Sequence, residues 1–165
     1  MLGTCIRNFR GGRPVRYFHL EVKNEHFSKT SFNTYAYLER IVDLRSGKPV
    51  DLKLVEFKWR GVVFPNVVIP YQSSREFDAF RVYHDSPSQL HLGAFTDSPD
   101  HMKALGPGDY ELTFVVHSQN FGVSRSIFRL QAGGGNLINI KFYPKGFSEF
   151  YSVNPTGIRR VSALH

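Results

Sequence analysis

Hydrophobic and polar residues alternate in two stretches between residues 15 and 43. A period of two buries one face of a β-strand and leaves the other face for a different environment. A polar loop over residues 24–33 separates the two stretches, so the sequence predicts two strands that pair antiparallel if the loop returns directly. The positions expected to face the core are Phe18, Leu20, Val22, Ala36 and Leu38.

The same alternation recurs along the rest of the chain, separated by turns rich in glycine, proline, serine and asparagine. Residues 62–70 are less regular, and Pro65 and Pro70 indicate a bend or an edge strand, because proline cannot donate a hydrogen bond to a central strand. The further predicted strands are residues 50–55, 76–83, 90–95, 112–116, 123–130 and 137–143.

Asp78 interrupts the strand predicted at residues 76–83. In strict alternation it shares a face with Phe80 and Val82, which are expected in the core. Either a β-bulge corrects the alternation or the carboxylate caps a turn. A catalytic role for this aspartate is the weakest interpretation.

Turns about every eight to twelve residues, with no sustained helical period, favour an all-β antiparallel sandwich. We expect seven to nine strands, with Trp59 packed in the core rather than serving as a ligand platform. The segment Leu105 to Tyr110 places a tyrosine after a glycine-rich turn at the start of a buried strand. This is the arrangement of the tyrosine corner in immunoglobulin-like sandwiches.

Several short motifs resemble those of the immunoglobulin-like accessory modules of prokaryotic proteins, over residues 15–143. These modules show a V-x-N strand end, a small residue entering the next strand, and a P-G-x-Y corner. The matching residues here are Val22, Asn24, Ala36, Pro107, Gly108 and Tyr110. The chain departs from that pattern by an insertion after Tyr83. The resemblance implies an immunoglobulin-like fold and a role in interaction, adhesion or spacing without catalysis.

The net charge of +7 is concentrated at the two ends of the chain. Residues 1–16 hold four arginines and no acid, and residues 144–165 add two net positive charges, so the segment between them is nearly neutral. We expect a basic, flexible arm at residues 1–14, a sandwich domain at 15–143 and a tail at 144–165. The arm is a disordered terminus, an edge strand, or a contact for phosphates or an acidic partner through Arg7, Arg10 and Arg13.

Cys5 is the single cysteine, which excludes an internal disulfide and fits a reducing compartment. The sequence contains neither an apolar run long enough to span a bilayer nor a hydrophobic signal core near its start. We therefore expect a soluble cytoplasmic protein without a membrane partner.

The sequence contains no strong catalytic or cofactor-binding motif. There is no G-x-S-x-G elbow, and the three glycines at residues 133–135 precede a predicted strand rather than a helix that could bind phosphate. Histidines and aspartates gather at residues 84–101 without the tight spacing of metal ligands, and we interpret them as polar loop residues. We expect no enzymatic activity, no metal and no cofactor. The residues weighed as metal ligands are His84, Asp85, His91, Asp97, Asp100 and His101.

An aromatic face is predicted on the outer side of the two opening strands. Its four rings could stack on a sugar or a base, or simply pair across strands. Lys23 and Arg40 are too few to decide between these readings. Phe147, Phe150, Tyr151 and Val153 of the tail pack across the sandwich edge or contact a partner. The residues of the predicted aromatic face are Tyr17, His19, Tyr35 and Tyr37.

The leading hypothesis is a non-catalytic module that binds protein partners or assembles into oligomers. Its expected contact surfaces are the aromatic face, the loop at residues 84–102 and the C-terminal tail. The alternatives are a nucleic-acid or polyanion binder that uses the arginine arm, and a carbohydrate-binding module that uses Tyr35.

Overall fold

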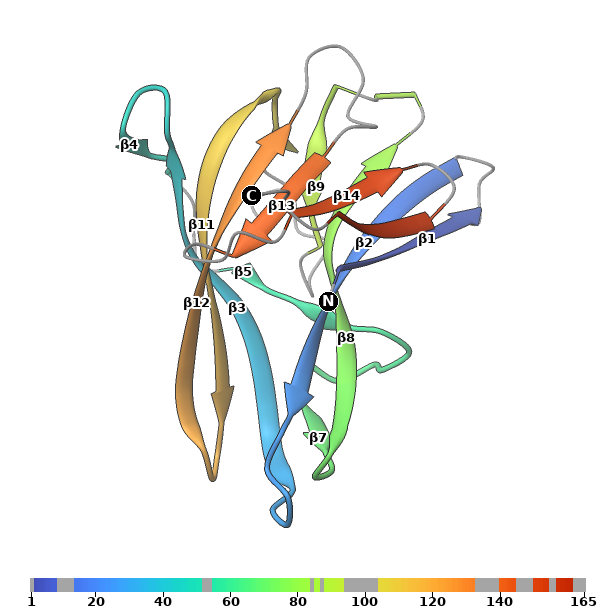
Figure 1. The fold of residues 1–165 in the computed structure, drawn as a ribbon, viewed down its shortest axis with the longest axis vertical. Helices are drawn as coiled ribbons and strands as arrows, with labels where there is room; N and C mark the ends of the chain where they lie inside the picture. The colour runs from blue at the N-terminus through green and yellow to red at the C-terminus, as the bar shows by residue number, and fades with distance from the viewer. Residues whose placement is uncertain are drawn as a thin grey trace.

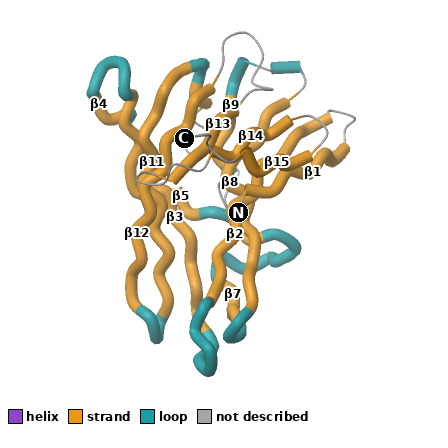
Figure 2. Tube along the Cα trace, viewed as in Figure 1, coloured by secondary structure: helices purple, strands orange, loops and turns teal. Residues whose placement is uncertain are grey.

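A computed structural model describes most of the chain as strands and loops, with no helix in the described residues (Figure 2). The described residues are 2–8, 14–51, 55–83, 85–86, 88–93, 104–132, 140–144, 150–154 and 157–161. Two antiparallel sheets pack against each other as a β-sandwich, which confirms the all-β fold class expected from the alternation. In Figure 1, β3, β11 and β12 belong to one layer, and β2 and β8 belong to the other.

The first sheet has the strand order β1-β2-β8-β9-β10, and β6 also pairs with β8. All of its pairs are antiparallel. Its strands are β1 (Leu2–Asn8), β2 (Pro14–Asn24), β6 (Lys58–Trp59), β8 (Ser73–Tyr83), β9 (Leu90–Leu92) and β10 (Ala104–Leu105).

The second sheet has the order β15-β14-β13-β12-β11-β3-β4, and β5 and β7 also pair with β3. Its pairs are antiparallel as well. Its strands are β3 (Ser31–Asp43), β4 (Lys48–Pro49), β5 (Val55–Glu56), β7 (Val67–Ile69), β11 (Gly108–Ser118), β12 (Gly122–Ala132), β13 (Ile140–Pro144), β14 (Phe150–Asn154) and β15 (Gly157–Val161).

The described residues form more strand segments than the seven to nine expected. One reason is that β4, β5, β6 and β10 are only two residues long. Another is that β1, β14 and β15 lie in the segments expected to be an arm and a tail, and their backbones pair with neighbouring strands. For residues 2–8 the backbone therefore takes the edge-strand form, one of the three alternatives for the arm.

The core between the sheets is dominated by aromatic side chains. Trp59 is fully buried, and its indole Nε1 donates a 3.0 Å hydrogen bond to the carbonyl oxygen of Pro65. Its ring meets Phe77 edge to face at 5.6 Å, which confirms the predicted core role. Burying each large apolar side chain contributes about 1.5–3 kcal/mol, so this cluster is a main source of stability. The other large buried residues are Phe18, Phe57, Phe80, Leu38, Ile41, Ile69, Leu90, Leu92, Leu112 and Leu130.

The two opening strands do not pair with each other, so that prediction is wrong. β2 pairs with β1 and β8, whereas β3 pairs with β11, and the intervening loop crosses from one sheet to the other. By facing each other across the core, both strands bury their apolar faces. The Asn24 side chain anchors the crossing, because its Nδ2 donates to the carbonyl oxygens of Lys29 and Ile69 at 2.8 and 3.0 Å.

A β-bulge in β8 resolves the irregular position of Asp78. Phe18 lies opposite Phe80 and His19 lies opposite Asp78, so Ala79 is the extra residue on β8. The bulge keeps Phe77 and Phe80 in the core while it places Asp78 beside His19. Of the two alternatives drawn from the sequence, the bulge is therefore the one confirmed.

Candidate functional site

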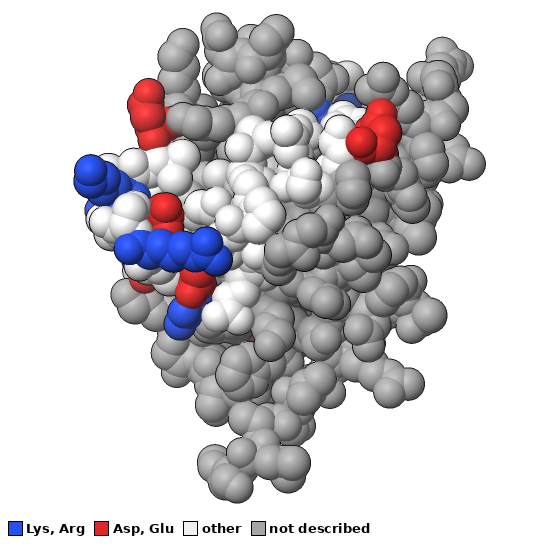
Figure 3. Space-filling model, turned by 90° about the horizontal axis from the view of Figure 1, so that it is seen from above, with Lys and Arg blue, Asp and Glu red and all other residues white. Residues whose placement is uncertain are grey.

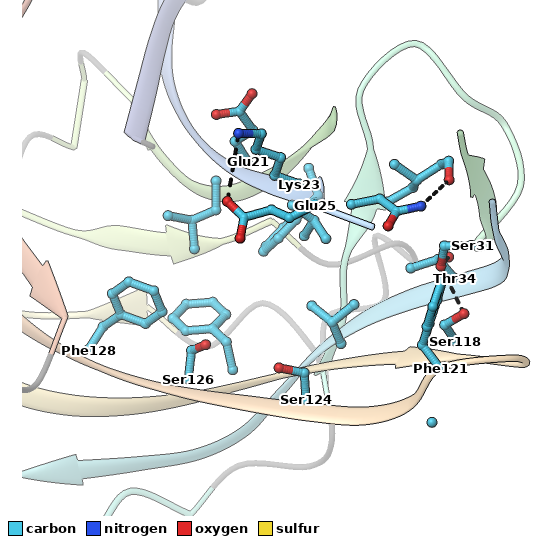
Figure 4. Close-up of a pocket in the computed structure, with 18 residues that line it drawn as sticks. Glu21, Lys23, Glu25, Ser31, Thr34, Ser118, Phe121, Ser124, Ser126 and Phe128 are labelled. Atoms are coloured by element: carbon cyan, nitrogen blue, oxygen red, sulfur yellow. Dashed lines mark hydrogen bonds and ion pairs between the residues drawn. The ribbon is translucent and has the colours of Figure 1, made fainter. Parts of the chain in front are cut away.

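A groove opens between the two sheets, with β2 along one wall and β12 along the other (Figure 4). Its volume is about 470 Å³, a size typical of sites that hold a ligand or a peptide side-chain row. Apolar side chains of both sheets form its floor. They are Leu20, Val22, Ile69, Phe77, Phe114, Val116 and Phe128.

Both walls of the groove are strand edges over part of their length. Among the described residues, β1 pairs with β2 up to Leu20, and β13 pairs with β12 from Phe128 onward. Within the described residues, the stretches 22–24 and 122–127 therefore have a neighbouring strand on one side only. Backbone N–H and C=O groups along such an edge are available to another strand.

Hydroxyl groups follow the β12 wall and close one end of the groove. Figure 4 shows the Ser124 and Ser126 side chains on the β12 wall of the groove. At the end, Ser31 bonds to Thr34 at 2.7 Å and donates to Ser118 at 2.8 Å. The groove thus combines an apolar floor with a polar but uncharged wall.

Charges near the groove are few and largely paired. Lys23 Nζ lies 3.6 Å from the Glu25 carboxylate, and Glu21 accepts a 2.5 Å hydrogen bond from Ser74. Three ionisable side chains line the groove, two acids and one base, which leaves a slight negative excess. A groove of this charge repels a polyanion and suits a neutral or weakly basic ligand.

A cluster of aromatic side chains lies beside one end of the groove. Phe27 is 80% exposed and stacks on His26 with ring centroids 4.9 Å apart. The His26 ring also lies 5.6 Å from Phe121, which lines the groove and is 43% exposed. We call His26, Phe27 and Phe121 the aromatic tip. Clustered exposed apolar rings are typical of interaction sites.

The predicted aromatic face does not form a single surface. Tyr17 and His19 belong to β2 in the first sheet, whereas Tyr35 and Tyr37 belong to β3 in the second. Tyr35 and Tyr37 are half-buried and stack on each other at 6.0 Å as neighbours on one face of the same strand, and Tyr35 also packs across the strands against His117 at 6.5 Å, so they do not form an open platform.

Tyr17 and His19 are buried rather than exposed, with 8% and 3% of their surface accessible. The expectation of an exposed face at these two residues is therefore wrong. Burial raises the pKa of Tyr17, against the lowering effect of the nearby Arg81 guanidinium. On the neighbouring strand β8, Arg81 lies opposite Tyr17 and Asp78 lies opposite His19.

These partners form a second cluster, on the outer side of the first sheet. His19 Nδ1 lies 2.7 Å from Asp78 Oδ1, and the Arg81 guanidinium lies over the Tyr83 ring at 5.6 Å. The His19 and Asp78 atoms lie within ion-pair distance, but among the described residues neither the ring nitrogens of His19 nor Oδ1 of Asp78 make a hydrogen bond. We call His19, Asp78, Arg81, Tyr83 and His91 the polar cluster.

The polar cluster predicts a pH dependence of stability. Burial, and next the Arg81 guanidinium, hold the pKa of His91 below its ordinary value, against the opposing effect of Asp85. The folded state therefore binds a proton less readily than the unfolded state, and the stability present above about pH 6.5 falls as the pH drops through that value. In urea titrations, we expect His91→Gln to lose less stability than the wild type between about pH 7.5 and pH 5.5. Equal losses in both proteins would contradict this role of His91.

Several predicted site residues lie outside the described part of the chain. These are Arg10, Arg13, His84, Asp97, Asp100, His101 and Phe147. The backbone of Arg7 belongs to β1, and those of Phe150, Tyr151 and Val153 belong to β14, but their side chains are not described. Among the described residues, no group of three potential ligands could hold a metal ion, and no helix is long and apolar enough to cross a membrane.

Sequence reasoning missed the groove and the aromatic tip. The available signals were a phenylalanine in an otherwise polar loop, Phe27, and the alternating serines Ser124 and Ser126 in a predicted strand. Comparisons of the chain with family models, curated proteins and solved structures found no match.

Proposed function

We propose that this chain is a non-catalytic binding module whose groove receives an extended segment of a protein partner. The observation that carries the proposal is the pair of strand edges, at residues 22–24 and 122–127, on either side of an apolar floor. Strand edges supply backbone hydrogen bonds, and the floor supplies apolar burial, which together are the two requirements for binding an extended peptide.

We further propose that the sandwich is of the immunoglobulin-like type. The tyrosine corner supports this, because the Tyr110 hydroxyl donates a 3.1 Å hydrogen bond to the carbonyl oxygen of Gly106, a few residues upstream. The Tyr110 ring also lies against Gly108, where a Cβ would come within 2.7 Å of it. Modules of this type commonly serve interaction and assembly, in line with the proposed role.

The electrostatics favour a protein segment over a nucleic acid in the groove. Phosphate contacts require several cations, whereas the groove is lined by a single lysine that is paired with Glu25. In Figure 3, described basic side chains lie next to acidic ones, and no continuous basic patch covers the described part of that face. Polyanion binding therefore remains a separate alternative that would use the arginine arm and not the groove.

A carbohydrate site at Tyr35 has less support. The Tyr35 ring is engaged by Tyr37 at 6.0 Å and by His117 at 6.5 Å, and its hydroxyl accepts a hydrogen bond from Asn66 at 3.1 Å. Stacking on a sugar needs a free ring face. The groove and the aromatic tip offer more accessible apolar surface.

Panning a phage library of random short peptides against the immobilised protein tests the proposal. Ser126→Trp fills the groove from its β12 wall, and Ile127→Trp places the same ring on the opposite face of the same strand as a matched control. We expect the wild type and Ile127→Trp to enrich common peptides, and these peptides to bind Ser126→Trp at least about tenfold more weakly, a difference of about 1.4 kcal/mol.

Failure to enrich any peptide, or equal binding to Ser126→Trp, would overturn the proposal. A different outcome would favour the arginine arm. The protein would then bind an oligonucleotide with an affinity that falls steeply with salt, that Ser126→Trp does not change, and that is lost when residues 1–16 are deleted.

A further inference from the structure

We infer that the partner segment binds as an added β-strand along the 122–127 edge of β12, with alternate large apolar side chains directed into the groove. This inference rests on the proposed function and specifies the conformation, the edge and the chemistry of the segment. The two strand edges differ in how well they are protected against pairing with another strand.

The β2 edge carries the protection that natural edge strands use. Over a short stretch it holds Glu21, Lys23 and Glu25, and the Lys23 ammonium lies 3.6 Å from the Glu25 carboxylate. Charged side chains on an edge discourage pairing with a further strand. The β2 wall is therefore better suited to bound side chains than to a new backbone ladder.

The β12 edge lacks this protection. Its groove side presents Gly122, Ser124 and Ser126, none of which is charged. Arg125 is the single charged residue within 122–127, and on the opposite face its Nε and Nη2 each donate to Glu39 at 3.0 Å. The charge is thus neutralised and directed away from the groove, so the edge can accept a strand.

The existing neighbour of β12 shows the geometry that such a strand would take. β13 pairs antiparallel with β12 from Ala132 to Phe128, and its last paired residue is Pro144, opposite Phe128. Within the described residues the pairing ends at Pro144, which has no N–H to donate, whereas β12 continues to Gly122. An added strand would pair with residues 122–127 of β12 and lie in line with β13 in the same sheet.

The side-chain pattern of the bound segment follows from the pleat of the sheet. Residues opposite Ser124 and Ser126 point to the groove face, because cross-strand neighbours share a face. There they meet Phe114, Phe128 and the β2 wall, so large apolar residues are required at every second position. Residues between them lie beside Val123, Arg125 and Ile127 on the outer face and can be polar.

The charge of the groove restricts the segment further. Two carboxylates and one ammonium group line it, so a segment with acidic residues on the groove side would be repelled. The aromatic tip lies at the end of the groove that Phe121 lines. Its rings can stack on an aromatic residue at one end of the bound segment. The expected partner is therefore a neutral or weakly basic strand with alternating apolar residues.

The test uses the strongest peptide selected by the wild-type protein in the panning, made in two N-methylated forms. In one form the backbone amides of the odd-numbered peptide residues are methylated, and in the other form those of the even-numbered residues are methylated. Because only one set of amides in an added strand donates to β12, we expect one form to bind at least about tenfold more weakly and the other to bind like the parent. We also expect slower hydrogen exchange at amides within 122–127 when the unmodified peptide is bound.

Each contrary result is distinct from a failure of the proposed function. The selected peptide could lose its binding to Ser126→Trp and yet bind equally well in both N-methylated forms, or it could carry its apolar residues at helical spacing. Either result would keep the groove as a binding site but overturn the inference of an added strand. Protection confined to residues 22–24 would overturn the choice of edge. If light scattering shows a concentration-dependent dimer that Ser126→Trp abolishes and the peptide disrupts, the natural occupant is a second copy of the chain, which overturns the assignment to a separate partner.

Discussion

Replacing Gly93 with alanine is expected to lower the free energy of unfolding by about 3 kcal/mol, the upper end for an added methyl group in a packed site. A Cβ at this position would lie 1.9 Å from the carbonyl oxygen of Asp78, a backbone atom that cannot rotate away. The amide of Gly93 also donates a 2.9 Å hydrogen bond to the carbonyl oxygen of Ala79, the extra residue of the bulge. Relief of the clash would therefore disturb the bulge itself.

Urea denaturation of Gly93→Ala and of a control variant, Gly106→Ala, measures this effect. A Cβ at Gly106 would meet no atom within 4 Å, so we expect that variant to stay within about 0.5 kcal/mol of the wild type. Equal midpoints for the two variants would show that the close approach of Gly93 to β8 does not constrain the fold.

The strands were predictable from the sequence because alternation is a local property of the chain. Phe18, Leu20, Ala36 and Leu38 are buried as the pattern predicted, and the break at Asp78 was recognised before its cause was known. Which strands pair was not predictable in the same way. β2 and β3 both carry one apolar face, and such faces can lie side by side in one sheet or opposite each other in two.

The alternation along a strand also does not predict whether its polar face is exposed or buried. Alternation identified Tyr17 and His19 as lying on the face away from the core, but it gave no sign that this face is covered. Their neighbours on β8 are Arg81 opposite Tyr17 and Asp78 opposite His19, and the bulge between these two positions sets that register. Long-range register is the information that a single sequence lacks.

The groove depends on where pairing stops, which a strand pattern does not reveal. Residues 123–130 were predicted as one strand, and β12 is one strand, but in the described part of the chain its pairing with β13 is confined to residues 128–132. Pro144 was a visible reason for the pairing to end, although its position opposite Phe128 becomes clear only from the register. The functional candidate therefore arises from the mismatch in length between neighbouring strands.

Replacing Asp78 with alanine is expected to lower the free energy of unfolding by about 2 kcal/mol, within the range for leaving a buried polar group without its partner. His19 is 3% exposed, and its Nδ1 faces the Asp78 carboxylate at 2.7 Å. Within the described residues neither ring nitrogen makes a hydrogen bond, so the close contact with the Asp78 carboxylate is the polar interaction of this buried imidazole that the alanine variant would remove.

Two controls separate this effect from the loss of any carboxylate on β8. Asp78→Asn keeps a polar oxygen close to His19 Nδ1, and we expect it to lose clearly less stability than Asp78→Ala. Glu76→Ala removes a carboxylate that pairs with Arg60 at 2.5 Å at the surface, and such exposed pairs contribute at most about 1 kcal/mol. Urea midpoints in the order wild type, Glu76→Ala, Asp78→Ala, with the last clearly lowest, would support the assignment. If Asp78→Ala is no less stable than Glu76→Ala, the carboxylate is not what holds His19 in its buried position, and the bulge would serve the packing of Phe77 and Phe80 alone.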